Sequence, residues 1–199
     1  MQAFWDERYA AKDYAYGTAP NAFLAEKLPG LPTGRALFPA EGEGRNAAYA
    51  AELGWKVDAF DYSKSAREKA MKLFAERQVS VQYELSSVEA YAFETAAYDL
   101  VFLCFAHLPP PLRAHLHKQA AQALKPGGLL LLEGFHTDQL PRSSGGPKRA
   151  EMLFSTDGLA EEFPGLETEQ LERVVTVLAE GPYHRGEAVV VRMQARKPR

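Results

Sequence analysis

The sequence contains a single cysteine, Cys104, among its 199 residues. One thiol excludes an internal disulfide framework, a Cys-x-x-Cys redox pair and a zinc cluster held by thiolates, and it is typical of a reducing compartment. The five histidines and the carboxylates also lack the compact spacing of metal ligands, so we expect no metal site. No repeat with a period of about 20 to 50 residues occurs, which favours one domain over a repeat array.

Long hydrophobic runs and an excess of positive charge are missing as well. No run approaches the ~18 apolar residues of a membrane-spanning helix, and the first residues lack the basic start and apolar core of a signal peptide. The 23 Lys and Arg residues are outnumbered by 26 Asp and Glu residues, which leaves no electrostatic footprint for nucleic acid or anionic lipid. We therefore expect a cytoplasmic protein that binds neither nucleic acid nor membranes.

The hydrophobic pattern from residue 35 onward alternates between short apolar runs and segments with helical spacing. Strands are expected at residues 36–38, 56–61, 79–85, 98–105 and 129–133, and helices at residues 45–53, 63–74 and 109–124. Ser63 is the expected N-cap of a helix with Ala66, Ala70, Leu73 and Phe74 on one face. Strands that alternate with helices predict a mainly parallel sheet with helices on both faces.

The two ends of the chain follow different patterns. Residues 4–28 hold aromatic and apolar residues at roughly helical spacing, interrupted by Gly17 and Pro20, which predicts two helices with a break. Near the other end we expect a short helix at residues 157–163, then β-rich runs at residues 171–178 and 187–195 that form an antiparallel hairpin. The prediction is an α/β fold with a seven-stranded, mainly parallel sheet, a helical lid over residues 1–34 and a core over residues 35–199.

A glycine-containing loop, Glu41-Gly42-Glu43-Gly44-Arg45-Asn46-Ala47, separates the first expected strand from the first helix of the core. Glycines there let the backbone approach a ligand, and the helix N-terminus offers free amides and partial positive charge. Asp61 ends the next strand, where an acidic side chain can accept both hydroxyls of a ribose. The loop and Asp61 together indicate a site for a nucleoside-containing cofactor.

Two classes of enzyme combine such a loop with an acid on the second strand: dinucleotide oxidoreductases and S-adenosylmethionine enzymes. Gly42-x-Gly44-x-x-Ala47 satisfies the dinucleotide pattern. Against it, an aromatic-rich helical segment precedes the first strand, no Tyr-x-x-x-Lys pair follows the fourth, and a hairpin ends the chain in place of a further βα unit. These features favour S-adenosylmethionine. An NAD(P)-dependent oxidoreductase and a non-catalytic nucleotide-binding domain remain as alternatives.

Further motifs occur along the whole chain: Trp5-Asp6-Glu7-Arg8-Tyr9, Tyr16-Gly17, Pro20-Asn21, His107-Leu108-Pro109, Lys125-Pro126-Gly127-Gly128 and Gly145-Gly146-Pro147-Lys148. Together with the glycine loop and Asp61, they resemble the small bacterial class I S-adenosylmethionine-dependent methyltransferases of the tellurite-resistance and thiopurine type. The resemblance implies a single Rossmann-like methyltransferase domain, S-adenosyl-L-methionine as cofactor, and a small-molecule methyl acceptor such as a thiol or a chalcogen oxyanion. It also implies a monomer or a weak homodimer.

The chain departs from this family at the start of the first motif. Phe38 stands where the family has an acid that orders the loop, and Ala40 stands where it has a glycine. We expect Glu41 to take over part of the role of the missing acid. On the third strand, Ser87 and Val88 occupy the place of the residues that face adenine.

The resemblance and the strand ends together define the expected site. The candidate cofactor-binding residues are Trp5, Tyr16, Ala40, Glu41, Gly42, Gly44, Arg45, Asn46, Asp61, Tyr62, Ser87, Val88, Cys104 and Phe105. The candidate catalytic residues are His107, His184 and Tyr183: His107 as a proton acceptor, and His184 or Tyr183 in the acceptor pocket. Cys104 is expected as a wall of the site because methyl transfer needs no enzyme nucleophile.

Two mobile covers are expected over this site. Trp5, Tyr9, Tyr14 and Tyr16 are candidates for an aromatic lid over the sulfonium, since aromatic faces attract cations. The loop at residues 145–149, with Lys148 and Arg149, is a candidate to close over an anionic acceptor.

Overall fold

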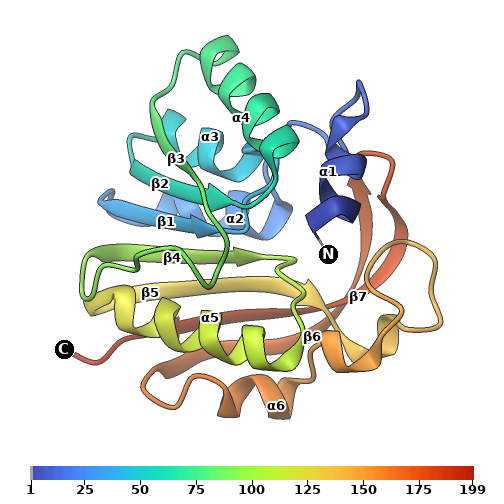
Figure 1. Cartoon of the computed structure of the whole chain (residues 1–199). Coiled ribbons are helices and arrows are strands. Elements are labelled where there is room, and N and C mark those ends of the chain that lie inside the picture. Colours follow the sequence, from blue (N-terminus) through green and yellow to red (C-terminus); the bar gives the residue numbers. More distant parts are fainter. Residues whose placement is uncertain (1) are drawn as a thin grey trace.

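The computed structural model describes residues 2–199 and contains a seven-stranded sheet (Figure 1). In chain order the strands are β1 (Arg35–Pro39), β2 (Lys56–Asp61), β3 (Val81–Leu85), β4 (Tyr98–Cys104), β5 (Leu124–Phe135), β6 (Glu167–Glu180) and β7 (His184–Arg196). The helices are α1 (Gln2–Ala10), α2 (Ala22–Lys27), α3 (Arg45–Glu52), α4 (Lys64–Glu76), α5 (Pro110–Ala123) and α6 (Thr156–Glu161). Single 3₁₀ turns occupy Leu28–Gly30, Thr137–Gln139 and Ala150–Met152.

The strand order is β3-β2-β1-β4-β5-β7-β6. Strands β1 to β5 pair in parallel, whereas β7 pairs antiparallel with both β5 and β6. The predicted fold, a mainly parallel Rossmann-like sheet with a C-terminal antiparallel hairpin, is therefore confirmed. The last strand of the chain lies inside the sheet and β6 lies at its edge, so one strand alone runs against the others.

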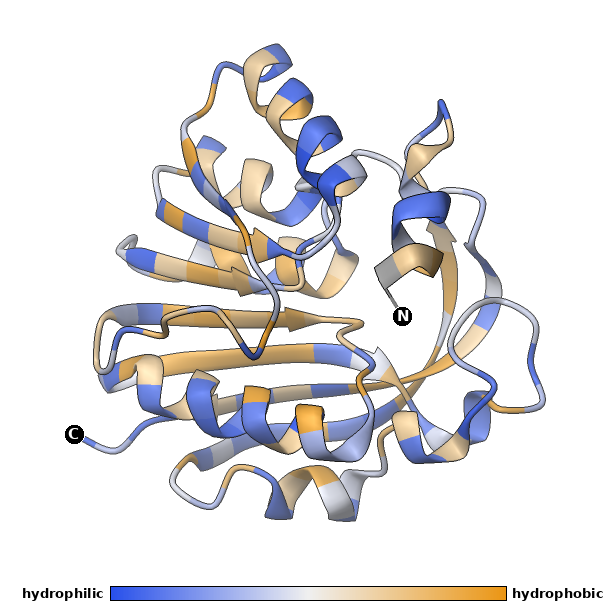
Figure 2. Ribbon diagram, viewed as in Figure 1, coloured by the Kyte–Doolittle hydropathy of each residue, from blue (hydrophilic) through white to orange (hydrophobic). Residues whose placement is uncertain are grey.

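The alternation of side chains along the central strands places helices on both faces of the sheet. Along β1, Ala36 and Phe38 pack on the side of α2, α3 and α4, while Leu37 packs on the side of α5. Strand β4 repeats this pattern with Leu100 and Phe102 on the first side. Figure 2 shows that β4 and β5 are hydrophobic along most of their length, as expected of strands covered on both faces.

Most predicted elements form at the expected places. Ser63 caps α4 by accepting a hydrogen bond from the amide of Ala66, and the four apolar residues expected on the inner face of α4 are all buried. The strands of the hairpin are longer than expected because charged residues continue them outward. Strand β5 begins at Leu124, five residues early, since the turn before Leu129 also pairs with β4 through an irregular register.

The N-terminal segment packs over the carboxyl ends of the strands (Figure 1). Helix α1 contacts α4, and Tyr9, Ala15 and Ala66 form a small apolar cluster there with Trp5 and Tyr16. Within residues 2–199, no helix has the length and apolar character needed to cross a bilayer.

Candidate active site

A cavity of about 470 Å³ opens at the carboxyl ends of the parallel strands, where open sheets of this kind bind ligands. Most of the predicted cofactor-binding residues line it: Trp5, Tyr16, Ala40, Glu41, Arg45, Asn46, Asp61, Tyr62, Cys104 and Phe105. The candidate catalytic residues His107 and His184 line it as well. Gly42, Gly44, Ser87, Val88 and Tyr183 do not. The chain folds so that one cavity collects residues from both of its ends.

Asp61 lies at the end of β2 with its side chain buried against the cavity. Its two carboxylate oxygens accept backbone hydrogen bonds from Gly42 (3.1 Å) and Ser63 (2.8 Å), and it forms no ion pair within residues 2–199. Burial raises the pKa of Asp61 to about 6. A buried carboxylate without a cationic partner suits neutral donors, and the two hydroxyls of a ribose are donors of that kind.

Glu41 follows β1 and turns back onto the N-terminus of α3. Its Oε1 atom accepts hydrogen bonds from the amides of Asn46 and Ala47, both at 2.9 Å. Burial raises the pKa of Glu41 to about 7, although the hydrogen bonds from these two amides lower it. The carboxylate of Glu41 thus occupies the helix N-terminus at which we expected a ligand. A dinucleotide would need those amides for its pyrophosphate. This contact disfavours the NAD(P) alternative.

The loop glycines serve the packing of the protein. Gly44 has φ +84°, and a Cβ atom there would lie 2.8 Å from both Ala70 and the ring of Phe74 on α4. At Gly42, with φ +64°, a Cβ atom would lie 2.8 Å from the hydroxyl of Tyr9. We expected both glycines to allow the approach of a ligand; the contacts found are with helices α4 and α1. Ala40 also has a positive φ of 51° at the position where the family has glycine.

His107 lies in the wall of the cavity with both ring nitrogens bonded to the backbone. Its Nδ1 atom donates to the carbonyl of Met152 at 2.7 Å, and its Nε2 atom accepts from the amide of Phe135 at 2.9 Å. Burial lowers the pKa of His107 to about 4. Neither nitrogen is available to take a proton from a substrate, so the geometry does not favour the expected role of His107 as a base.

His184 lies at the start of β7, and one of its two ring nitrogens has a hydrogen-bond partner within the described residues. Its Nδ1 atom lies 3.1 Å from Oε2 of Glu180, whereas no hydrogen bond to its Nε2 atom occurs within the described residues. Its ring packs against Tyr16 at 4.4 Å and Phe105 at 4.5 Å between ring centres. Burial lowers the pKa of His184, so its imidazole is neutral at neutral pH.

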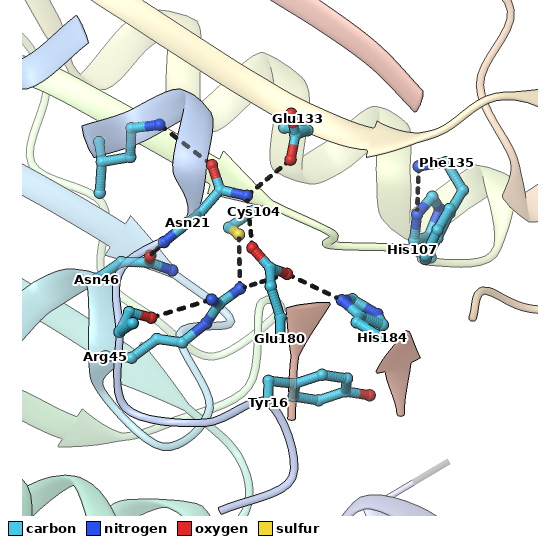
Figure 3. A network of polar contacts seen from close by, with 12 residues as sticks. Tyr16, Asn21, Arg45, Asn46, Cys104, His107, Glu133, Phe135, Glu180 and His184 are labelled. Carbon is cyan, nitrogen blue, oxygen red and sulfur yellow. Dashed lines mark hydrogen bonds and ion pairs between the residues drawn. The ribbon is translucent and has the colours of Figure 1, made fainter. Parts of the chain in front are cut away.

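A buried polar network joins four segments beside the cavity (Figure 3). Glu180 accepts hydrogen bonds from Arg45 at 3.0 Å and from Asn21 at 3.3 Å, in addition to its contact with His184. Asn21 also donates to Glu133 at 2.7 Å, and its backbone amide donates to the side chain of Asn46. The network holds the N-terminal segment, the start of α3, β5 and the hairpin in one arrangement.

Cys104 ends β4 next to this network. Arg45 Nη2 lies 4.0 Å from its sulfur, and burial raises the pKa of the thiol well above its ordinary value. An un-ionised thiol is a poor nucleophile. The geometry of Cys104 therefore agrees with its expected place in the wall of the site.

The expected aromatic lid forms only in part. Trp5 and Tyr9 stack with 5.4 Å between ring centres, and both line the cavity together with Tyr16. The guanidinium of Arg8 lies over the half-exposed ring of Tyr183 and donates to the hydroxyl of Tyr16. Tyr14 faces away and donates to the carbonyl of Lys69.

The loop at residues 145–149 reaches the cavity from the opposite side. Gly146, Pro147 and Arg149 line the cavity, whereas Lys148 bonds to the carbonyl of Arg142 within its own loop. Sequence reasoning did not identify several further wall residues, namely Phe4, Arg8, Ala106, Leu108, Pro109, Phe135 and Met152. It also missed Glu180, whose only local signal is its place four residues before His184 in the hairpin.

Comparison with known proteins places this geometry in a family. Residues 39–128 match the family model described as "Methyltransferase domain". The chain is 31% identical to a probable thiol methyltransferase 2 of Arabidopsis thaliana over 146 residues, which are 72% of this chain and 63% of that protein. It is 27% identical to thiocyanate methyltransferase 1 of the same plant over 130 residues, 64% of this chain and 57% of that protein. The chain thus spans less than two thirds of either relative.

Solved structures show the same fold. TehB from Haemophilus influenzae superposes with a TM-score of 0.74 at 17% identity, covering 98% of this chain and 66% of that one. A protein from a study of the conversion of a disulfide bond into a thioacetal group during echinomycin biosynthesis superposes with a TM-score of 0.80 at 17% identity, covering 100% and 93%.

The sheet order, the cavity at its carboxyl edge and the family match define a Rossmann-like methyltransferase domain. The chain resembles the class I S-adenosylmethionine-dependent methyltransferases, as the sequence motifs implied: a methyltransferase-domain model matches residues 39–128, a probable plant thiol methyltransferase is 31% identical, and TehB shares the fold. The methyltransferase-domain match supports S-adenosylmethionine as the cofactor.

Proposed function

We propose that the protein methylates a small-molecule thiol, or a related soft chalcogen anion, in the cytoplasm. The observation that carries this proposal is the wall of the cavity around His184, where the rings of Tyr16, Phe105 and Phe135 pack against a neutral imidazole. We take this part of the cavity as its acceptor end. The names of the two plant relatives support a sulfur acceptor. We also propose that residues 1–199 act as one domain, with residues 1–34 as a lid on the core.

The residues around the cavity fit S-adenosylmethionine. Asp61 would hold the ribose hydroxyls, and Cys104 and Phe105 would bound the methionine end. Trp5 and Tyr16 would face the sulfonium, because aromatic rings stabilise a nearby cation. When bound, the cofactor supplies a methyl group already activated for transfer. The tasks left to the protein are alignment, exclusion of water and removal of the acceptor's proton.

His184 is the residue that we propose for proton removal. A thiol must lose its proton to become a strong nucleophile. The proton would pass to Nε2 of His184 as the acceptor sulfur forms its bond to the methyl carbon. In that transfer the bound cofactor would supply the methyl group and would leave as S-adenosylhomocysteine, while His184 would hold the proton taken from the acceptor.

The test is incubation with methyl-labelled S-adenosylmethionine and a panel of thiols, selenite and tellurite. We expect label in a methyl thioether formed from at least one thiol, and less label when Asp61 is replaced by Ala at a cofactor concentration below the Kd of the wild-type protein. Label transferred to selenite or tellurite and to none of the thiols would exclude the thiol class.

A further inference from the structure

Glu180 joins Arg45, the first residue of α3, to the imidazole of His184 in the cavity wall. We propose that Glu180 is a positioning residue that fixes the tautomer and orientation of His184, so that Nε2 faces the acceptor as the proton-accepting atom. This inference rests on the proposed function, in which His184 removes the acceptor's proton.

The contacts around Glu180 are short and shielded from solvent. Its Oε2 atom is shared by Arg45 Nη2 at 3.0 Å and His184 Nδ1 at 3.1 Å. The exposed fractions of the three side chains are 12% for Glu180, 8% for Arg45 and 7% for His184. Figure 3 shows the guanidinium and the imidazole meeting this carboxylate from two sides. Such a carboxylate has little freedom to turn away from the imidazole.

The charge of Glu180 determines which nitrogen of His184 carries the hydrogen. The contacts with His184 and Arg45 lower the pKa of Glu180 to about 2 despite its burial, so the carboxylate is ionised at neutral pH. An ionised carboxylate only accepts hydrogen bonds, and Arg45 only donates them. His184 must therefore donate from Nδ1, which leaves the lone pair of its neutral ring on Nε2.

The groups that surround His184 would otherwise make it a poor base. Arg45 from α3 and Arg8 from α1 oppose its protonation, and burial acts in the same direction. A charge on His184 would lower the pKa of the neighbouring His107, and the ring of Tyr16 packs against that of His184. Among these groups, Glu180 alone favours the imidazolium that forms when His184 takes a proton. Without the charge of Glu180, the two arginines would still oppose protonation of the imidazole and no carboxylate would offset them.

A purely structural role for Glu180 would be to neutralise Arg45. Two acceptors separate this role from positioning: 4-nitrobenzenethiol is ionised at neutral pH and needs no base, whereas 2-mercaptoethanol is mostly un-ionised and needs one. Glu180→Gln keeps the size of the side chain and removes its charge. We expect the kcat of this variant to fall at least ~10-fold with 2-mercaptoethanol and to change less than about twofold with 4-nitrobenzenethiol.

The pH profile and two further variants complete the test. In Glu180→Gln the acidic limb of the kcat profile for 2-mercaptoethanol should move to lower pH, because the imidazole becomes harder to protonate. Glu180→Asp should recover part of the rate. The matched control is Glu187→Gln, which removes an exposed carboxylate on β7 that pairs with Arg142 and does not line the cavity. It should leave both rates unchanged. An equal loss with both thiols, or no loss with either, overturns the inference.

Nitrogen NMR of the His184 imidazole tests the tautomer without turnover. We expect the hydrogen on Nδ1 in the wild-type protein, and a mixture of tautomers in Glu180→Gln. A wild-type signal with the hydrogen on Nε2 overturns the inference. If the wild-type enzyme methylates neither thiol while the Nδ1 hydrogen is observed, the proposed acceptor class fails and the positioning of His184 by Glu180 stands.

Discussion

Asp61 combines burial, a place in the cavity wall and two backbone hydrogen bonds that orient its oxygens. Replacement by Ala removes the charged acceptors proposed for the ribose hydroxyls. We expect Asp61→Ala to weaken the binding of S-adenosylhomocysteine by ~1–3 kcal/mol through the loss of charged hydrogen bonds. Calorimetric titration measures this difference directly.

A nearby carboxylate provides the control for Asp61. Glu84 is exposed on the neighbouring strand β3 and lies outside the cavity, so Glu84→Ala should bind S-adenosylhomocysteine as the wild-type protein does. An unchanged affinity in Asp61→Ala would misplace the ribose.

Glu41 affects stability through its raised pKa. Its pKa is about 7 in the folded protein against an ordinary value of 4.5, so between these pH values the folded state binds more protons than the unfolded state. The stability that Glu41 contributes is fully present below about pH 4.5 and is lost as pH rises through about 7. Near pH 8 this loss amounts to roughly 3 kcal/mol, from the free energy of one pKa unit.

Glu41→Gln removes this titration and keeps an oxygen for the amides of Asn46 and Ala47. We expect the variant's free energy of unfolding to fall less than that of the wild type between pH 5 and pH 8, as measured by urea denaturation. Identical pH dependence in the two proteins would contradict the raised pKa of Glu41.

At the scale of elements, the packing of α3 against α4 depends on Gly44. An Ala there adds a Cβ atom 2.8 Å from Ala70 and Phe74, in a backbone conformation with φ +84°. Strain of the left-handed backbone and overpacking together should cost about 2–5 kcal/mol. Urea unfolding of Gly44→Ala measures this cost.

Gly54 separates the two contributions. It has φ +88°, and a Cβ atom there would come no closer than 4.0 Å to Thr33. Gly54→Ala should therefore cost only the backbone strain of about 1–2 kcal/mol. Equal losses of stability at both positions would show that the contact between α3 and α4 does not require glycine.

Local patterns predicted these elements well because their causes are local. The cap at Ser63, the buried face of α4 and the two-sided burial of β4 follow from residues within one helix or strand. The loop glycines are different: their positions were evident, but Gly44 meets Ala70 and Phe74 from another helix. A reader of one sequence sees that glycine is present and does not see which neighbour requires it.

At the scale of the whole molecule, long-range pairing decides what the sequence could not predict. The hairpin was predicted, but its second strand lies between β5 and the first, a choice set by contacts across the sheet. Glu180 and Arg45 are 135 residues apart and meet only because the hairpin returns to the cofactor loop. Tyr183 lies half-exposed in the turn before β7, beside Arg8, whereas His184, the first residue of β7, lies in the cavity wall.

The cavity also explains why a small acceptor suits this chain. Residues from α1, the loop before α3, the ends of β2, β4 and β5, the loop at 145–149 and the start of β7 all enclose one space of about 470 Å³. The aromatic rings that pack against the neutral imidazole of His184 favour a soft, partly apolar acceptor over a strongly hydrated one.

Calorimetry of the wild-type protein with S-adenosylhomocysteine and with NADH tests the central claim most directly, since it needs no knowledge of the acceptor. The account predicts saturable binding of S-adenosylhomocysteine at one site per chain and no binding of NADH, because Glu41 occupies the amides that a pyrophosphate would need. Tight binding of NADH, with none of S-adenosylhomocysteine, would contradict it.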